Sequence, residues 1–172
     1  MTIKYFISLT LISTLAIISC NKAAPTGFWK NYKTEFLVRN ISDQGPHGGH
    51  RAIYWKTKKP LIFDTKNILE FARKNGWTLV DSLEYSKEQT DKWIYSNKAI
   101  FPLTSMGFSD TLLNNEHLRE FPRWFSGPVR LYKFKTGWVT VEQGTGNSIE
   151  ENGFILLNQA ENELAVYHLW GE

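Results

Sequence analysis

Residues 129–170, VRLYKFKTGWVTVEQGTGNSIEENGFILLNQAENELAVYHLW, contain four stretches typical of β-strands. The expected strands are 129–135, 138–143, 153–158 and 163–170. Each is rich in β-branched, aromatic or aliphatic residues, and Thr136 with Gly137 predicts a tight turn between the first two. Side chains alternate along the last stretch, which indicates one packed face and one partly wetted face. We therefore predict a C-terminal antiparallel β-meander.

The part of the chain before this meander is predicted to mix strands with one clear helix. Further strands are expected over residues 34–41, 51–57 and 77–85. Between the last two, Asp64 or Thr65 can cap a helix over 66–75, and Gly76 can end it in a left-handed conformation. The local signals at both ends of this helix make it the best-defined one in the sequence.

Further helices are expected in the middle of the chain. Ser86 and Gln89 have the spacing of a capping box, which predicts a short helix reaching about residue 95. Another helix is expected near 112–121, limited by Pro122. Two or three short helices together with a terminal meander predict an α+β fold, in a single domain over residues 28–172.

The N-terminal residues 1–20 read MTIKYFISLTLISTLAIISC. The uncharged stretch 5–18 has the length of a signal-peptide core and is shorter than the roughly 20 residues that span a bilayer. Its end, LAIISC at 15–20, resembles the lipobox of bacterial lipoproteins. The resemblance implies that 1–19 is a signal peptide, that lipid is attached to Cys20, and that 20–27 forms the lipidated cysteine and a short tether. An ordinary secretory signal or an uncleaved anchor are the alternatives.

The same resemblance predicts where the protein lies. It implies a lipid-anchored protein on the cell membrane, facing the periplasm. Asn21 follows the cysteine in place of the Asp that retains lipoproteins in the inner membrane of enteric bacteria, so the outer membrane is favoured in a Gram-negative cell. Cys20 is the only cysteine in the chain, so the domain is expected to fold without a disulfide.

Charge and aromatic content narrow the class of partner. The formal net charge is +3, and no basic tract or arm is present, which argues against nucleic acid. All seven tryptophans lie after the leader: Trp29, Trp55, Trp77, Trp93, Trp124, Trp138 and Trp170. We expect these rings mainly in the core of a sheet protein. The alternative is an aromatic platform for a sugar, a peptide or a partner protein.

The segment GPHGGHR at 45–51 is the first candidate site. His47, His50 and Arg51 are expected in a glycine-rich loop between two strands, where imidazole, guanidinium and backbone amides suit an anionic group. Two histidines could also contribute to a zinc or copper site, but no third ligand is marked by its spacing. We therefore predict a binding loop and no metal.

A second candidate, an interface for a protein, is formed by Arg119, Arg123 and Trp124, because arginine and tryptophan are enriched at such surfaces. A helix end whose arginines meet carbonyls and carboxylates is the alternative. No Gly-x-Ser-x-Gly motif and no phosphate-binding glycine loop occurs, so no catalytic residue and no cofactor is predicted.

These observations favour a non-catalytic binding module that is held to the membrane through Cys20 and binds a protein partner, as an assembly factor, an inhibitor or an immunity protein does. Two alternatives stay open. One is a cell-envelope hydrolase acting on peptidoglycan or lipid, with His47, His50 or His168 as its base. The other is a module that binds a sugar or another small ligand.

Overall fold

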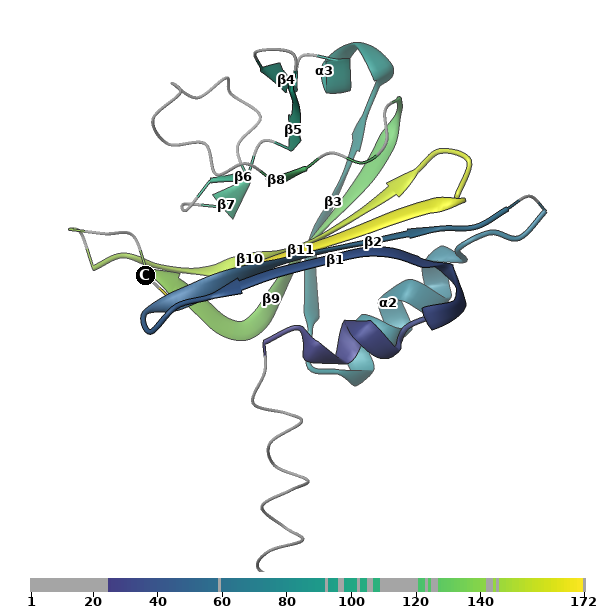
Figure 1. The fold of residues 1–172 in the computed structure, drawn as a ribbon. Helices are drawn as coiled ribbons and strands as arrows, with labels where there is room; N and C mark the ends of the chain where they lie inside the picture. The colour runs from purple at the N-terminus through teal and green to yellow at the C-terminus, as the bar shows by residue number, and fades with distance from the viewer. Residues whose placement is uncertain are drawn as a thin grey trace, which may run out of the picture.

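The chain is seen in a computed structural model, in which a six-stranded antiparallel sheet forms the centre (Figure 1). The structure describes residues 25–58, 60–91, 93–95, 98–101, 103–104, 107–108, 121–122, 124, 127–141, 144 and 146–171. The six strands, in their order across the sheet, are β1 (Leu37–Gln44), β2 (Gly48–Lys56), β11 (Glu163–Gly171), β10 (Ser148–Asn158), β9 (Val129–Val141) and β3 (Thr78–Tyr85).

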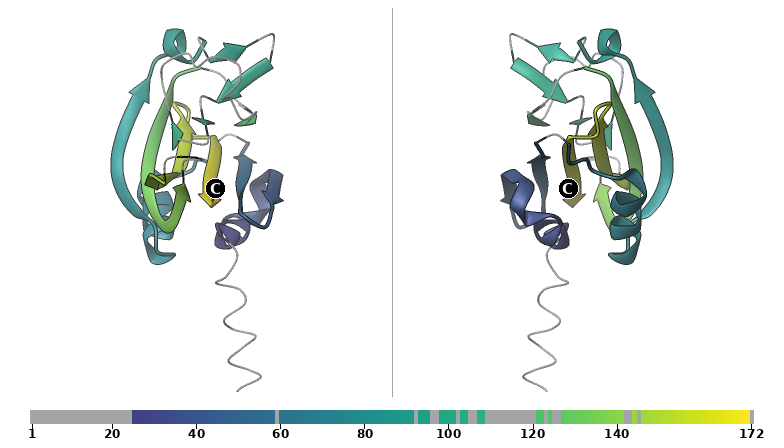
Figure 2. Two further views of the ribbon diagram at one scale, coloured as in Figure 1. Left: turned by 90° about the vertical axis from the view of Figure 1, so that its left-hand side faces the viewer. Right: turned by 90° about the vertical axis from the view of Figure 1, so that its right-hand side faces the viewer.

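Other elements cover both faces of this sheet (Figures 1 and 2). One face carries α2 (Thr65–Lys74) and two 3₁₀ turns, η1 (Gly27–Asn31) and η2 (Thr34–Phe36). On the other side lie α3 and five short strands: α3 (Lys87–Asp91), β4 (Ile94–Tyr95), β5 (Lys98–Phe101), β6 (Leu103–Thr104), β7 (Gly107–Phe108) and β8 (Phe121–Pro122). The sheet is therefore an inner layer. This explains why runs of five to seven consecutive residues are buried in each of β2, β10 and β11.

The predicted α+β class is wrong, because the fold is mainly β. The expected meander exists as β9, β10 and β11, but the first two predicted strands are one continuous strand of 13 residues. β2 pairs with β11 and β3 pairs with β9, so the upstream strands extend the meander into one sheet. The α-helices of the described residues, α2 and α3, are too short to form a layer comparable with that sheet.

The helix signals were correct about where helices begin and less informative about their length. Asp64 caps α2, because its carboxylate accepts a hydrogen bond from the backbone N–H of Asn67 at 2.8 Å. Ser86 and Gln89 form the predicted capping box. The helix that they begin has five residues, and Trp93, which follows it, is buried with its ring edge-on to that of Tyr85 at 5.0 Å. The helix predicted near 112–121 lies outside the described residues, apart from the last position.

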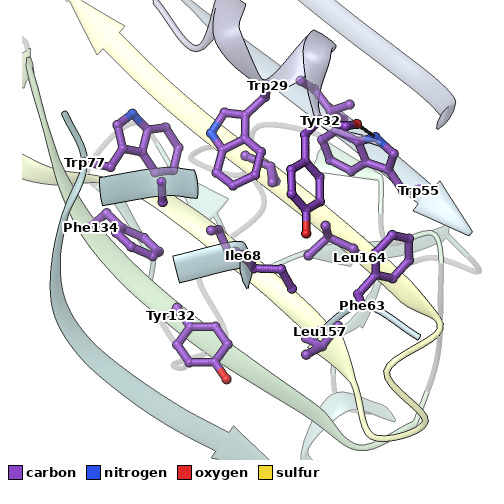
Figure 3. Packing of buried hydrophobic residues seen from close by; sticks show 14 residues of the cluster. Trp29, Tyr32, Trp55, Phe63, Ile68, Trp77, Tyr132, Phe134, Leu157 and Leu164 are labelled. Atoms are coloured by element: carbon purple, nitrogen blue, oxygen red, sulfur yellow. Dashed lines mark hydrogen bonds between the residues drawn. The ribbon is translucent and has the colours of Figure 1, made fainter. Parts of the chain in front are cut away.

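Aromatic rings fill the space between the sheet and α2 (Figure 3). Trp29, from η1, is fully buried and lies 6.1 Å from Trp55 and 5.6 Å from Trp77 between ring centroids. The indole N–H of Trp55 donates to the backbone carbonyl of Tyr32 at 2.9 Å. This packing fixes the N-terminal segment to the sheet and is consistent with the expected core role of most tryptophans.

Candidate functional site

The three residues of the predicted binding loop do not come together. His47 is exposed in the short turn between β1 and β2, whereas His50 and Arg51 belong to β2 itself. Successive residues of a strand point to opposite faces, so His50 and Arg51 lie on different sides of the sheet. Arg51 shares its face with Ile53 and Trp55, and His50 shares its face with Ala52 and Tyr54.

Arg51 is nevertheless an unusual residue, because its side chain is only 7 % exposed. Its Nη2 donates to the hydroxyl of Ser42 on β1 at 3.1 Å. Across the other side of β2, it lies opposite His168 of β11 in the strand register. Burial lowers the pKa of Arg51, since water is excluded from the charge.

His168 is the centre of a buried polar network that sequence reasoning did not identify. Its Nδ1 contacts the hydroxyl of Thr26, and its Nε2 lies 3.0 Å from the hydroxyl of Thr136. Thr136 in turn donates to the Oδ1 of Asn152 at 2.8 Å. The side-chain amide of Asn152 then donates to the carbonyls of Trp138 and Leu169, each at 2.9 Å.

These hydrogen bonds determine the state of the imidazole. Because Thr136 uses its only proton on Asn152, it can only accept from His168, so Nε2 carries the ring proton. Nδ1 is then the acceptor for Thr26. Burial, with the nearby charge of Arg51, lowers the pKa of His168 to about 3. The ring is therefore neutral, with both nitrogens engaged, and has no free lone pair to act as a catalytic base.

The one signal for this network in the sequence was the position of His168. It shares one face of the predicted strand with Leu164, Val166 and Trp170, which predicts that it lies on the packed face. Nothing in the spacing linked it to Thr26, Thr136 or Asn152, which lie 142, 32 and 16 residues away along the chain.

The second candidate site is only partly described. Trp124 stacks between two tyrosines of the sheet, 5.4 Å from Tyr54 and 5.8 Å from Tyr167. Its ring therefore contributes to the core on that face. Arg119 and Arg123 lie outside the described residues, as does Cys20.

The two edge strands of the sheet differ in where their pairing is irregular. β3 has a register shift between Leu79 and Asp81, and the Asp81 carboxylate accepts from the backbone N–H of Ser82 at 2.7 Å. Bulges and charges of this kind block the addition of another strand. β1 has one register shift near its start and then pairs regularly with β2 from Arg39 to Gln44.

The outer edge of β1 is open in the described part of the chain, where β2 is its single partner strand. Every second N–H and C=O along a regular edge strand faces away from its neighbour. Seven of the eight residues of β1 are exposed, and the apolar Val38 and Ile41 are among them. The strand contains neither proline nor lysine, and its charged residues are Arg39 and Asp43. This edge can accept an extended segment of another chain.

A hollow of about 800 Å³ lies on the α2 side of the sheet, at its other edge. Its apolar wall contains Leu69, Trp77, Leu79 and Phe134. A second hollow, of about 400 Å³, lies beside Tyr85 and Arg130. Neither contains a histidine, and within the described residues no three metal-ligating side chains gather.

Comparison with known proteins gives no relative from which to transfer a function. No family model matches the chain, and no curated protein or solved structure matches it significantly. Among the helices of the described residues, none has the length and apolar character needed to cross a bilayer.

Proposed function

We propose that this chain is a membrane-anchored periplasmic lipoprotein whose domain binds a protein partner without catalysing a reaction. The observation that carries the proposal is the open edge of β1, which pairs regularly with β2 from Arg39 to Gln44 and has no second partner strand among the described residues. A partner segment in extended conformation would add a strand there, with main-chain hydrogen bonds providing affinity and side-chain contacts providing specificity.

The proposed anchor would hold the domain close to the membrane. Pro25 and Thr26 are buried, and Thr26 contacts His168, so the packed domain includes residues this close to Cys20. Five residue steps separate Cys20 from Pro25 and span at most about 17 Å. With lipid on Cys20, β1 would therefore meet partners at or near the membrane surface.

The hydrolase alternative has less support. His168 is neutral and fully engaged, and His47 and His50 line neither of the two described hollows. The alternative of a small-ligand module would use the hollow between α2 and β3. That hollow offers an apolar wall, but its described polar residues are exposed or half-buried and do not converge as a binding site does.

Site-specific photo-crosslinking in intact cells tests the proposal. A photoreactive residue at Ile41, on β1, should give one discrete adduct with a protein. The same residue at Leu79, on the other edge strand β3, is a matched control, because Ile41 and Leu79 are 42 % and 45 % exposed. Equal adducts at both positions, or none at Ile41, would contradict binding through β1.

A further inference from the structure

Arg51 has hydrogen-bonding capacity that the described residues do not use. Its Nη2 donates to Ser42, but Nε and Nη1 are buried and have no acceptor. These two nitrogens carry three N–H bonds. Buried polar groups are almost always paired, so such a group indicates that something else completes the site.

No described neighbour neutralises the guanidinium. The residue opposite it on β11 is His168, which is neutral and has both nitrogens engaged. Burial is the cause of the lowered pKa of Arg51, with no carboxylate acting in the opposite direction. A buried charge without a counter-charge is unfavourable, and an oxyanion is the group that a guanidinium pairs with best.

The position of Ser42 indicates where such an anion would come from. Ser42 lies on β1, directly opposite Arg51, so the guanidinium is close to the open edge of the sheet. A strand added beside β1 would place one of its side chains about 5 Å from Ser42, measured between Cβ atoms. An acidic side chain at that position would be within reach of Arg51.

We propose that Arg51 and Ser42 form a binding site for the carboxylate of an Asp or Glu side chain on the partner strand. This inference rests on the proposed binding of a strand at β1, and it specifies the chemistry of that strand. It also gives a reason for a buried arginine in a strand whose next four residues are all buried and are either aliphatic or aromatic.

Acetate tests the carboxylate site without any partner. We expect the melting temperature of the full-length protein to rise saturably with acetate, and not with chloride at the same ionic strength. The rise should be lost in Arg51→Gln and reduced in Arg51→Lys, which keeps the charge but lacks the planar guanidinium. Arg39→Gln, at an exposed arginine of β1, is the matched control and should respond like the wild type. A response of Arg51→Gln equal to that of the wild type would overturn the site.

Two synthetic extended peptides, identical except for a central Glu or Gln, test the source of the carboxylate. The Glu peptide should bind the wild type about tenfold more tightly, and Arg51→Gln should bind both equally. Equal binding of the two peptides to the wild type, or no binding of either, overturns the acidic-strand inference even where acetate binds.

The crosslinking experiment separates the failure of this inference from the failure of the proposed function. If adducts form at Ile41 but the protein shows neither an acetate response nor a preference for the Glu peptide, the proposed function stands and this inference is refuted. An acetate response without adducts would refute the proposed function instead.

Discussion

At Gly153, on β10, the sheet leaves no room for a side chain. A Cβ atom there would lie 2.5 Å from the Cγ2 of Thr136 and 2.9 Å from the Cζ3 of Trp77. Gly153 also pairs with His168 in the register of β10 and β11. The glycine therefore allows the Trp77 ring and the polar network to pack against the same piece of backbone.

We predict that Gly153→Ala destabilises the fold by about 1–3 kcal/mol, because the added methyl group overpacks the core. Gly45→Ala is the matched control, since its nearest neighbouring atom would be 3.7 Å away, and it should change stability by less than about 0.5 kcal/mol. Urea unfolding of both variants measures the difference. Equal stabilities would show that the sheet relaxes at Gly153.

His168 predicts a specific dependence of stability on pH. The pKa of its side chain is about 3 in the folded protein and about 6.5 in the unfolded chain. Below pH 6.5 the unfolded chain therefore binds a proton that the folded protein does not, and stability falls as the pH falls towards 3. His168 should contribute a loss of up to about 1.4 kcal/mol per pH unit.

Urea unfolding between pH 7 and pH 4.5 measures this contribution. As the pH is lowered, the stability of the wild type should fall more steeply than that of His168→Gln, whose side chain is polar but does not ionise. Parallel curves for the two proteins would mean that the imidazole is not buried in its neutral form.

At the scale of elements, η1 acts as a cover for one face of the sheet. Its residue Trp29 contacts the rings of Trp55 on β2 and of Trp77, which immediately precedes β3, and none of its surface is exposed. We predict that Trp29→Ala costs about 3–5 kcal/mol, as is usual for a large buried ring. Trp138→Ala, at a ring that is 40 % exposed, should cost far less. Thermal unfolding separates the two, and a small loss at Trp29 would mean that η1 is not part of the core.

How far the sequence predicted the elements depended on how local their signals were. α2 was predicted correctly because its cap, Asp64, and its periodicity lie within a dozen residues. The fold class was not predicted correctly, because the pairing of β2 with β11 joins segments that are more than a hundred residues apart in the sequence. No local pattern indicates which strands become neighbours.

The candidate binding site stays a prediction, and the sequence located its residues only in part, for a related reason. The residue types around 45–51 suggested a loop that binds an anion. The glycines there were interpreted as a long loop, but β2 begins at Gly48. At Gly49, a Cβ atom would meet the backbone oxygen of Asp43 and the Trp170 ring, so glycine is required by close packing. The strand then separates His50 from Arg51.

At the scale of the whole molecule, coverage of both sheet faces leaves the edges as the main open surfaces of the sheet. Of these, β3 is interrupted by a register shift between Leu79 and Asp81, whereas β1 pairs regularly from Arg39 to Gln44. Pro25 and Thr26 are buried and lie five and six positions after Cys20. With lipid on Cys20, as proposed, the domain would therefore present the open strand β1 close to its anchor.

We predict that Cys20→Ala releases the protein from membranes without unfolding the domain, because Cys20 precedes the buried residues and has no second cysteine to pair with. Fractionation with labelled lipid measures the anchoring, and circular dichroism measures the fold. Serine at the same position should behave like alanine. Membrane association that persists without lipid label in both variants would refute lipidation.

Amide hydrogen exchange tests the binding of a partner strand to β1 most directly. The exchange of β1 is compared between the protein in its native membranes and the purified protein. We predict slower exchange of the outward-facing amides of Arg39–Gln44 in the membranes and unchanged exchange along β3, because only β1 gains a hydrogen-bonded neighbour. Equal exchange of β1 in both samples, or equal protection of both edge strands, would contradict the account.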